Sequence, residues 1–488
     1  MRPEEFEQIA IEGGEPAREL VIALLEQVSQ IPLQAARIEE LERRLSRNSS
    51  NSSKPPSSDE PKSRAERRRK ARQAFKRSMR KSGGQPGHKG KTREPVAPER
   101  VDERLEHLPQ VCGCGHTFDG SETQSGDPVI HQQYELPVIE PLVLEHLRIR
   151  LECPCCGKAN LAELPKPALA GFGPRLDAHI AMLAGVMRLS RSDVRRVVEE
   201  VFGVPASMGA IDNAIMRMSD VLADPWAELQ NAIRQAEVVH ADETGWRLAG
   251  AQQWLWVAAA SLVACFRIDP TRSQAAAKAL LGEDFGGFVV SDRYAGYHFL
   301  DVLQQQLCWC HVIRQFVEIS QRPDISGLRG EQLVKLARAV IAAHRVYLAE
   351  DHPAQWLAEE LGPLRTSIRK VLEQCAAGRD VRTANFAAGL LGEYKALWTF
   401  ADVPQAEIDP TNNVAERAVR HAVLMRKIQG GTRSDRGSRW VERIQSMRET
   451  CRLQGRSVLA WLVDAATAAH AGQPIPTLVP VPAIDSDP

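Results

Sequence analysis

Two aspartates, Asp242 and Asp292, each follow a short stretch whose apolar residues are arranged as in β-strands. We therefore expect both carboxylates at strand ends, where an α/β sheet presents functional groups to solvent. Carboxylate oxygens are the ligands preferred by hard divalent cations such as Mg²⁺ and Mn²⁺. The pair predicts a site for these metals.

A third carboxylate, Glu416, falls in the first turn of a predicted helix. The helix follows the polar run 409–413, whose Asp, Thr and Asn residues favour helix starts. Arg417 and Arg420 lie nearby, so one helix face would offer a metal ligand beside side chains that bind phosphate. Each acid also has an ordinary interpretation: Asp242 could cap a turn, Asp292 could start a helix, and Glu416 could pair with Arg420.

The elements that must position these acids are read from hydrophobic periodicity. A meander of three strands is predicted at 237–242, 254–258 and 264–268. A helix at 273–281 and an apolar strand at 287–290, ending at Asp292, follow. Helical sequence at about 322–400 then resembles an insertion before Glu416. We expect a catalytic domain over 235–470, and a Pro-rich, disordered tail over 471–488.

The N-terminal part of the chain has two different compositions. Residues 1–47 are predicted to be helical, and Ile38, Leu41 and Leu45 fit either a short coiled coil or a helix packed on its own chain. Residues 48–105 are polar and basic and begin with a Ser/Pro-rich run. Such a segment cannot bury a core, so we expect a disordered linker.

Positive charge is concentrated in this linker. Residues 62–93 contain fourteen Lys and Arg against one Glu, about +13, although the whole chain has 62 basic and 62 acidic residues. A basic arm of this density favours nucleic-acid binding by counterion release over a merely solvated charge run. The candidate DNA-binding residues of the arm are Arg67, Arg68, Arg69, Lys70 and Arg72.

Five of the ten cysteines cluster within 106–165, a predicted zinc-binding domain with strand-like sequence at 142–151. Cys153 and Cys156 have the spacing at which two thiolates reach one Zn²⁺. Cys112 and Cys114 are separated by a single residue, so His116 or Cys155 could replace one of the four as a ligand. Structural zinc is predicted at Cys112, Cys114, Cys153 and Cys156, with buried free thiols as the alternative.

Residues 166–234 are predicted to be helical, with a break at 203–205. The helix, turn and helix around this break resemble a DNA-binding helix-turn-helix, in which Arg195 and Arg196 would contact DNA. Two helices joined by such a turn are equally common in any α-bundle.

Several further features bear on the site and on location. His311 could act near a scissile phosphate or be a satisfied core histidine, whereas Cys308 and Cys310 flank Trp309 in a strand-like context that favours packing. The segment 429–434 favours a plain turn, with Arg433 a candidate DNA contact.

Because no apolar run approaches the roughly 18 residues needed to cross a bilayer and no secretory signal is seen, a cytoplasmic, nucleoid-associated location is expected.

Over nearly its full length the chain resembles the transposases of the IS66 insertion-sequence family. The residues that carry this resemblance are Asn-Ser-Ser-Asn-Ser-Ser-Lys-Pro-Pro-Ser-Ser-Asp (48–59), Gly-Gln-Pro-Gly-His (84–88), His-Ala-Asp-Glu-Thr-Gly-Trp (240–246), Ser-Asp-Arg-Tyr-Ala-Gly-Tyr (291–297), Cys-Trp-Cys-His (308–311) and Asn-Asn-Val-Ala-Glu-Arg (412–417). The resemblance implies an RNase H-like core with a DDE triad at Asp242, Asp292 and Glu416. It also implies a helical insertion before the glutamate, a zinc-binding region and a helix-turn-helix.

The expected protein is a multidomain α/β plus α transposase: an RNase H-like mixed sheet flanked by helices, with a helical insertion, preceded by coiled-coil, zinc-binding and helix-turn-helix regions. Two divalent ions, Mg²⁺ or Mn²⁺, roughly 3.5–4 Å apart would support phosphodiester cleavage and strand transfer without a covalent intermediate. The expected partners are element-end and target DNA, further copies of the chain, and small companion proteins of the same element. The alternatives are a catalytically silent DNA-binding regulator and a nuclease that cuts without joining.

Overall fold

The computed structural model describes residue 41 and residues 93–480. Most of the predicted linker, most of the predicted N-terminal helical segment, and the basic residues Arg67, Arg68, Arg69, Lys70 and Arg72 lie outside the described residues. Residues 93–105 of the predicted linker are described and contain a 3-10 turn at Pro98–Arg100. The described residues divide into two compact units, one containing residues 93–140 and the other containing residue 41 and residues 141–480. Among the described residues, no helix combines the length and the apolar character that a bilayer span requires.

A mixed five-stranded sheet forms the centre of the larger unit, in the order β5-β4-β3-β6-β7. Its antiparallel half is the predicted meander, made by β3 (Val238–Leu248), β4 (Ala251–Ala259) and β5 (Ala264–Asp269). Its parallel half adds β6 (Phe288–Ser291) and β7 (Gln305–Leu307). The meander and the strand before Asp292 are confirmed.

The strand β3 is longer than predicted, and Asp242 therefore lies within it rather than at its end. The strand continues because Ala249 and Gly250 have positive φ values of 48° and 88°, the geometry of a tight hairpin turn, which keeps β3 paired with β4 as far as Leu248. The strand β3 pairs with β6 only over Val238–His240. Asp242 thus lies where the parallel neighbour ends, not where its own strand ends.

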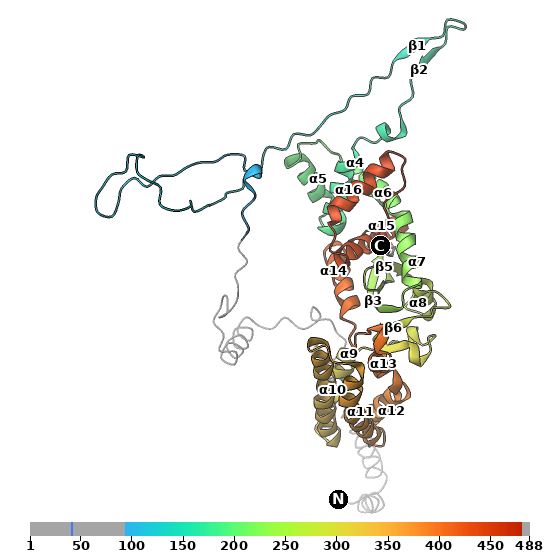
Figure 1. The fold of residues 1–488 in the computed structure, drawn as a ribbon. Coiled ribbons are helices and arrows are strands. Elements are labelled where there is room, and N and C mark those ends of the chain that lie inside the picture. Colours follow the sequence, from blue (N-terminus) through green and yellow to red (C-terminus); the bar gives the residue numbers. More distant parts are fainter. Residues whose placement is uncertain (1–40, 42–92, 481–488) are drawn as a thin grey trace, which may run out of the picture. The chain divides into compact units, whose positions relative to one another are not determined.

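Helices cover both faces of the sheet. In Figure 1, α14 (Asn413–Gln429) lies to the left of the strands, and α7 (Ala223–Arg234) and α8 (Gln274–Leu281) lie to their right. The α8 helix is confirmed at its predicted position, and the side chain of Ser273 caps it by accepting a hydrogen bond from the backbone of Ala276.

The free edge of β5 is covered by α15 (Asp435–Leu453). Side chains of this helix accept hydrogen bonds from the edge strand: the backbone N–H of Phe266 donates to Ser446 Oγ at 2.8 Å, and that of Ile268 donates to a Glu442 carboxylate oxygen at 2.6 Å. An edge strand satisfied in this way cannot recruit another chain.

Helices also occupy the sequence before the sheet. They are α4 (Pro174–Ala181), a π-helical turn (Met182–Val186), α5 (Arg191–Glu200) and α6 (Met208–Val221). The predicted helix, turn and helix is present as α5 and α6. Both begin at serine caps, and their buried residues share one hydrophobic cluster with the sheet, α15 and α16 (Val458–His470).

The predicted helical sequence before Glu416 forms a second layer of helices. After α9 (Trp309–Ser320) come α10 (Ile325–Ala349), α11 (Ala354–Ala376), α12 (Val381–Gly392) and the short α13 (Thr399–Asp402). Their apolar side chains form a second cluster, which reaches the sheet through Val290 and Leu307. The indole N–H of Trp309 donates to the Leu397 carbonyl at 2.9 Å and joins α9 to the end of this segment.

Two local predictions need correction. Of the strand-like sequence expected at 142–151, only the last two residues belong to a strand, β1 (Arg150–Glu152), which pairs with β2 (Ala159–Leu161); both strands are exposed because no other described element packs on them. The tail, predicted to be disordered from residue 471, follows a defined path as far as residue 480. Leu478 is buried in the core and its carbonyl accepts a hydrogen bond from the Gln454 side chain at 2.7 Å.

Candidate functional site

Asp242, Asp292 and Cys308 lie side by side on three neighbouring strands: Asp292 and Cys308 directly follow β6 and β7, and Asp242 lies within β3 at the same level. The parallel register pairs His240 with Val290 and Ser291 with Leu307. Continuing each register places Asp242 beside Asp292, and Asp292 beside Cys308. Cys308 donates its backbone N–H to the Ser291 carbonyl at 2.8 Å, which supports this alignment.

Both aspartates are held by nearby backbone groups. The N–H of Glu243 donates to Asp242 Oδ1 at 2.9 Å, and the N–H of Tyr294 donates to Asp292 Oδ1 at 3.0 Å. Burial raises the pKa of Asp242 well above its ordinary value, and the negative charges of Glu243, Asp292 and Glu416 raise this pKa further. An all-oxygen set of acids that repel one another fits a hard divalent cation, which would offset that repulsion.

Glu416 occupies the first turn of α14, as predicted. The polar residues before this helix were expected to cap its start, but Asn412 has a different role. Asn412 makes no side-chain cap; instead its amide donates to the Ala241 carbonyl at 2.7 Å, and its backbone N–H donates to Cys308 Sγ at 3.2 Å. The amide reaches β3 because the helix start is buried against the residue that precedes Asp242.

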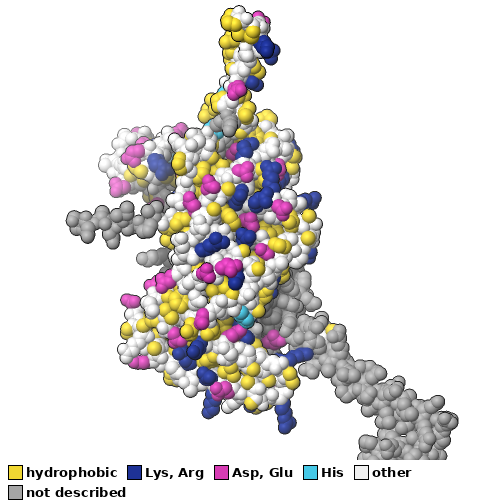
Figure 2. Space-filling model, turned by 90° about the vertical axis from the view of Figure 1, so that its right-hand side faces the viewer, with side chains coloured by type: hydrophobic (Ala, Val, Ile, Leu, Met, Phe, Trp, Pro, Cys, Tyr) yellow, Lys and Arg dark blue, Asp and Glu magenta, His cyan; other side chains and the backbone are white. Residues whose placement is uncertain are grey.

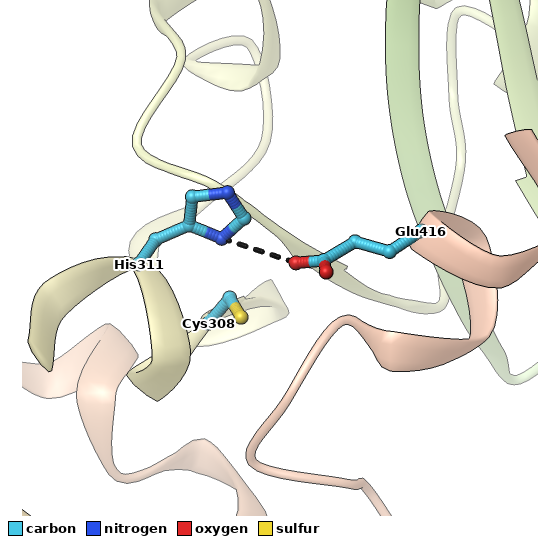
Figure 3. A group of neighbouring side chains, drawn as sticks. All are labelled: Cys308, His311 and Glu416. Atoms are coloured by element: carbon cyan, nitrogen blue, oxygen red, sulfur yellow. Dashed lines mark ion pairs between the residues drawn. The ribbon is translucent and has the colours of Figure 1, made fainter. Parts of the chain in front are cut away.

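The carboxylate of Glu416 faces α9 (Figure 3). Its Oε1 lies 3.6 Å from His311 Nδ1 and its Oε2 lies 3.9 Å from an Arg314 guanidinium nitrogen, so the nearest basic side chains to this carboxylate belong to α9, not to Arg420. Among the described residues, Glu416 forms a group with Cys308 and His311 whose ligand atoms all lie within 4.8 Å of one another, whereas Asp242, Asp292 and Glu416 form no such group.

The residues of the Cys-Trp-Cys-His motif differ from their predicted setting. Cys308 is the N-cap of α9, and Cys310 lies inside this helix rather than in a strand. His311 is not a satisfied core histidine, because its buried Nδ1 has no hydrogen-bond partner. Burial lowers the pKa of His311, which favours the neutral ring at neutral pH.

Glu243 has a structural role that was not predicted from the sequence. Its side chain is 1% exposed and accepts hydrogen bonds from Arg272 Nε and from the Tyr297 hydroxyl, each at 2.9 Å. Arg272 also stacks on the ring of Tyr294 at 3.8 Å. Since both tyrosines follow Asp292 in the chain, this network holds the loop of Asp292 against β3. The sequence clue to this role was that Glu243 directly follows Asp242 in the motif at 240–246.

The candidate DNA-binding arginines of the described residues have different surroundings. Arg417, Arg420 and Arg433 are exposed. Arg195 is bound to Glu199 at 2.7 Å, and Arg196 lies 4.0 Å from Glu200. On the face drawn in Figure 2, Lys and Arg side chains are interspersed with Asp and Glu, so this face is not uniformly basic.

The Gly-Gly segment after α14 is a turn, as expected, and it is docked on β3. Gly430 and Gly431 have φ values of 76° and 103°, and a Cβ at Gly431 would lie 2.3 Å from the Arg247 carbonyl oxygen. Thr432 donates its backbone N–H to that carbonyl at 2.8 Å, and its hydroxyl accepts from the Trp246 indole at 3.2 Å.

The four predicted zinc cysteines are divided between the two units, with Cys112 and Cys114 in one and Cys153 and Cys156 in the other. The second pair lies in a tight turn closed by a hydrogen bond from Gly157 N to the Cys153 carbonyl at 2.8 Å. Backbone N–H groups of Cys155 and Cys156 lower the pKa of Cys153, which favours its thiolate. Zinc binding at these cysteines stays a prediction.

Comparison with known proteins identifies the family. Residues 170–439 match the IS66 family of transposases, and residues 7–94 match a family of unknown function, DUF6444. An uncharacterized protein of Sinorhizobium fredii, y4qI, is 25% identical over 276 residues, which span 50% of this chain and 49% of that relative. The family match covers more than half of the sequence and contains Asp242, Asp292 and Glu416. The chain therefore belongs to the IS66 family of transposases.

Proposed function

We propose that this protein is the DNA transposase of an insertion sequence, which binds the element ends and catalyses phosphodiester cleavage and strand transfer at Asp242, Asp292 and Glu416. The observation that carries the proposal is that Asp242 and Asp292 lie next to each other where the parallel pairing of β3 with β6 ends. Glu416 lies on α14, and the Asn412 side chain binds the start of this helix to β3. The sheet order, with the longest strand central between an antiparallel and a parallel half, supports an RNase H-like core.

The three carboxylates would hold Mg²⁺ or Mn²⁺, which when bound would polarise the scissile phosphate and activate the attacking oxygen. The protein's own contribution is to fix the acids. Backbone N–H groups orient Asp242 and Asp292, and the Glu243–Arg272–Tyr297 network keeps the loop of Asp292 on β3. No side chain needs to form a covalent bond with DNA, so one site can serve water and then a freed 3′-hydroxyl when both DNAs are held in register.

DNA binding in this proposal combines several surfaces. Arg417 and Arg420 on the helix of Glu416 would hold phosphates beside the scissile bond, and Arg433 would extend the contact. The basic arm over 62–93 would add salt-dependent affinity, and α5 with α6 would act as a helix-turn-helix through Arg195 and Arg196. We also propose structural Zn²⁺ at the paired cysteines, assembly of several copies on DNA, and companion proteins of the same element as partners.

The test is a cleavage and strand-transfer assay on labelled element-end DNA with Mg²⁺ or Mn²⁺. Wild type is compared with Asp242→Asn, Asp292→Asn and Glu416→Gln, and Asp464→Asn, an exposed acid of α16, is the matched control. We expect wild type and the control to cut and join, and the three site variants to bind DNA without doing either. Site variants as active as wild type would refute the triad. Cutting without joining would favour a nuclease, and DNA binding without cutting by wild type would favour a regulator.

A further inference from the structure

A second set of possible metal ligands, of different chemistry, adjoins the aspartates. It consists of Cys308, His311 and Glu416, whose Sγ, imidazole nitrogen and carboxylate oxygen lie within 4.8 Å of one another (Figure 3). Within the described ranges, 41 and 93–480, no other group of three or more His, Cys, Asp or Glu side chains meets this criterion. Cys308 and His311 are three residues apart at the start of α9, a spacing that places both on one side of a helix turn.

Two of these ligand atoms lack partners. His311 Nδ1 and Glu416 Oε1 are both buried, and neither has a hydrogen bond. They face each other at 3.6 Å, which is too far for a hydrogen bond. Buried polar atoms without partners are rare in native proteins, and a bound ion is one physical reason for them. A cation between these two atoms would satisfy both.

The ligand types select the metal. A thiolate, an imidazole and a carboxylate together favour Zn²⁺, whereas Mg²⁺ prefers oxygen ligands alone. Ionised Cys308 and Glu416 would balance the two positive charges, with the thiol proton released to solvent. In the metal-free protein the hydrogen bond with Cys310 and burial raise the pKa of the Cys308 thiol, so the cation would have to displace its proton. The backbone N–H of Asn412, which donates to Cys308 Sγ at 3.2 Å, would then remain as a partner of the bound sulfur.

We propose that Cys308, His311 and Glu416 form a Zn²⁺ site, with water as the fourth ligand, that competes with the carboxylate site for Glu416. Zinc bound there keeps the Glu416 carboxylate on α9 and away from Asp242 and Asp292. Zinc would therefore inhibit the Mg²⁺-dependent reaction. The binding is independent of the proposed function, and only the inhibition rests on it.

The first experiment counts bound Zn²⁺ in the full chain by competition with a chromophoric chelator. Cys308→Ser and His311→Ala are expected each to bind one Zn²⁺ per chain fewer than wild type. Cys310→Ser, which removes the neighbouring thiol outside the group, is expected to match wild type. Equal Zn²⁺ counts for wild type and both site variants would overturn the proposal.

The second experiment replaces zinc by Co²⁺ and records the absorption spectrum. Cys112, Cys114, Cys153 and Cys156 are changed to Ser together, which removes the four predicted zinc ligands, and adding Cys308→Ser then tests whether a remaining thiolate-to-Co²⁺ band depends on Cys308. The band is expected to persist in this variant and to disappear when Cys308→Ser is added. Its absence from a folded four-cysteine variant, checked by circular dichroism, would overturn the site; if that variant does not fold, the Zn²⁺ count of the single variants decides.

The third experiment measures cleavage with and without one added equivalent of Zn²⁺ at constant Mg²⁺. The ratio of the two rates is expected to fall in wild type and to stay near unity in whatever activity His311→Ala retains. An unchanged ratio in wild type would overturn the inhibition. If wild type does not cleave DNA under any condition while the Zn²⁺ count differs as expected, the proposed function fails and the zinc site stands.

Discussion

The side-chain amide of Asn412 donates a hydrogen bond of 2.7 Å to the backbone carbonyl of Ala241, and so fastens the helix of Glu416 to the strand residue that precedes Asp242. Asn412 is 1% exposed, and its amide crosses between segments that lie 171 positions apart in the chain. This contact therefore sets how closely the third acid approaches the first.

Asn412→Ala is expected to lower DNA cleavage and to destabilise the fold by about 1–3 kcal/mol, because the buried Ala241 carbonyl loses its donor. Cleavage rates and urea unfolding measure the two effects. Asn413→Ala is the matched control, since Asn413 is exposed and its amide donates only to the nearby Thr411 hydroxyl. Equal effects of the two substitutions would contradict the role assigned to Asn412.

Without metal, the unfolding free energy is expected to depend on pH through Asp242. Because the folded protein raises the pKa of Asp242, the folded state holds its proton more tightly than the unfolded state. This contribution to stability is present at low pH and is lost as pH rises from the ordinary value of 3.8 toward the raised pKa. Asp242→Asn should therefore be more stable than wild type at neutral pH, and Mg²⁺ should stabilise wild type alone.

Urea unfolding of both proteins at several pH values, with and without Mg²⁺, tests this prediction. Asp464→Asn, at an exposed position, should change neither the pH dependence nor the effect of Mg²⁺. If Asp242→Asn has a lower unfolding free energy than wild type at neutral pH without metal, the charged carboxylate of Asp242 does not destabilise the folded state, and the prediction is wrong.

Glu243→Gln is expected to destabilise the protein by about 1–3 kcal/mol, because it leaves Arg272 without its anionic partner in a partly buried position. Arg272→Ala and the double variant complete a cycle whose energies should not add, since the two side chains are in contact. Urea unfolding measures all three. The exposed pair Arg369 and Glu373 is the control, and its removal should cost about 0.5 kcal/mol or less.

Gly431→Ala and Gly430→Ala separate backbone strain from steric overlap. Both glycines have positive φ, so each alanine should cost roughly 1–2 kcal/mol. At Gly431 the new Cβ would also meet the Arg247 carbonyl, whereas at Gly430 it meets nothing within 4 Å. Gly431→Ala should therefore have the lower unfolding midpoint in urea, and equal midpoints would mean that the turn can move away from β3.

Arg417→Ala and Arg420→Ala are expected to weaken DNA binding about equally for all sequences and to reduce the slope of log K against log salt by roughly one each. Fluorescence anisotropy at several salt concentrations measures both quantities. Arg369→Ala, an exposed arginine of α11, should leave the slope unchanged. A sequence-dependent loss would instead indicate contact with bases.

Local patterns in the sequence determined much of the architecture. Alternating apolar residues identified the meander, the helix-prone sequence at 273–281 identified α8, and the polar run before α14 placed Glu416 in a first turn. These features depend on residues within a few positions of one another, so they can be read without knowledge of the rest of the chain.

Contacts between distant segments decided the remainder. The hairpin turn extended β3 past Asp242, the direction of the Glu416 carboxylate depended on α9, and Glu243 acquired its role from Arg272 and Tyr297. Residues 473–480 likewise follow a defined path because the Leu478 side chain is buried in the hydrophobic core. In each case the partner lies elsewhere in the chain, and side-chain burial and hydrogen bonding across that separation are properties of the folded protein alone.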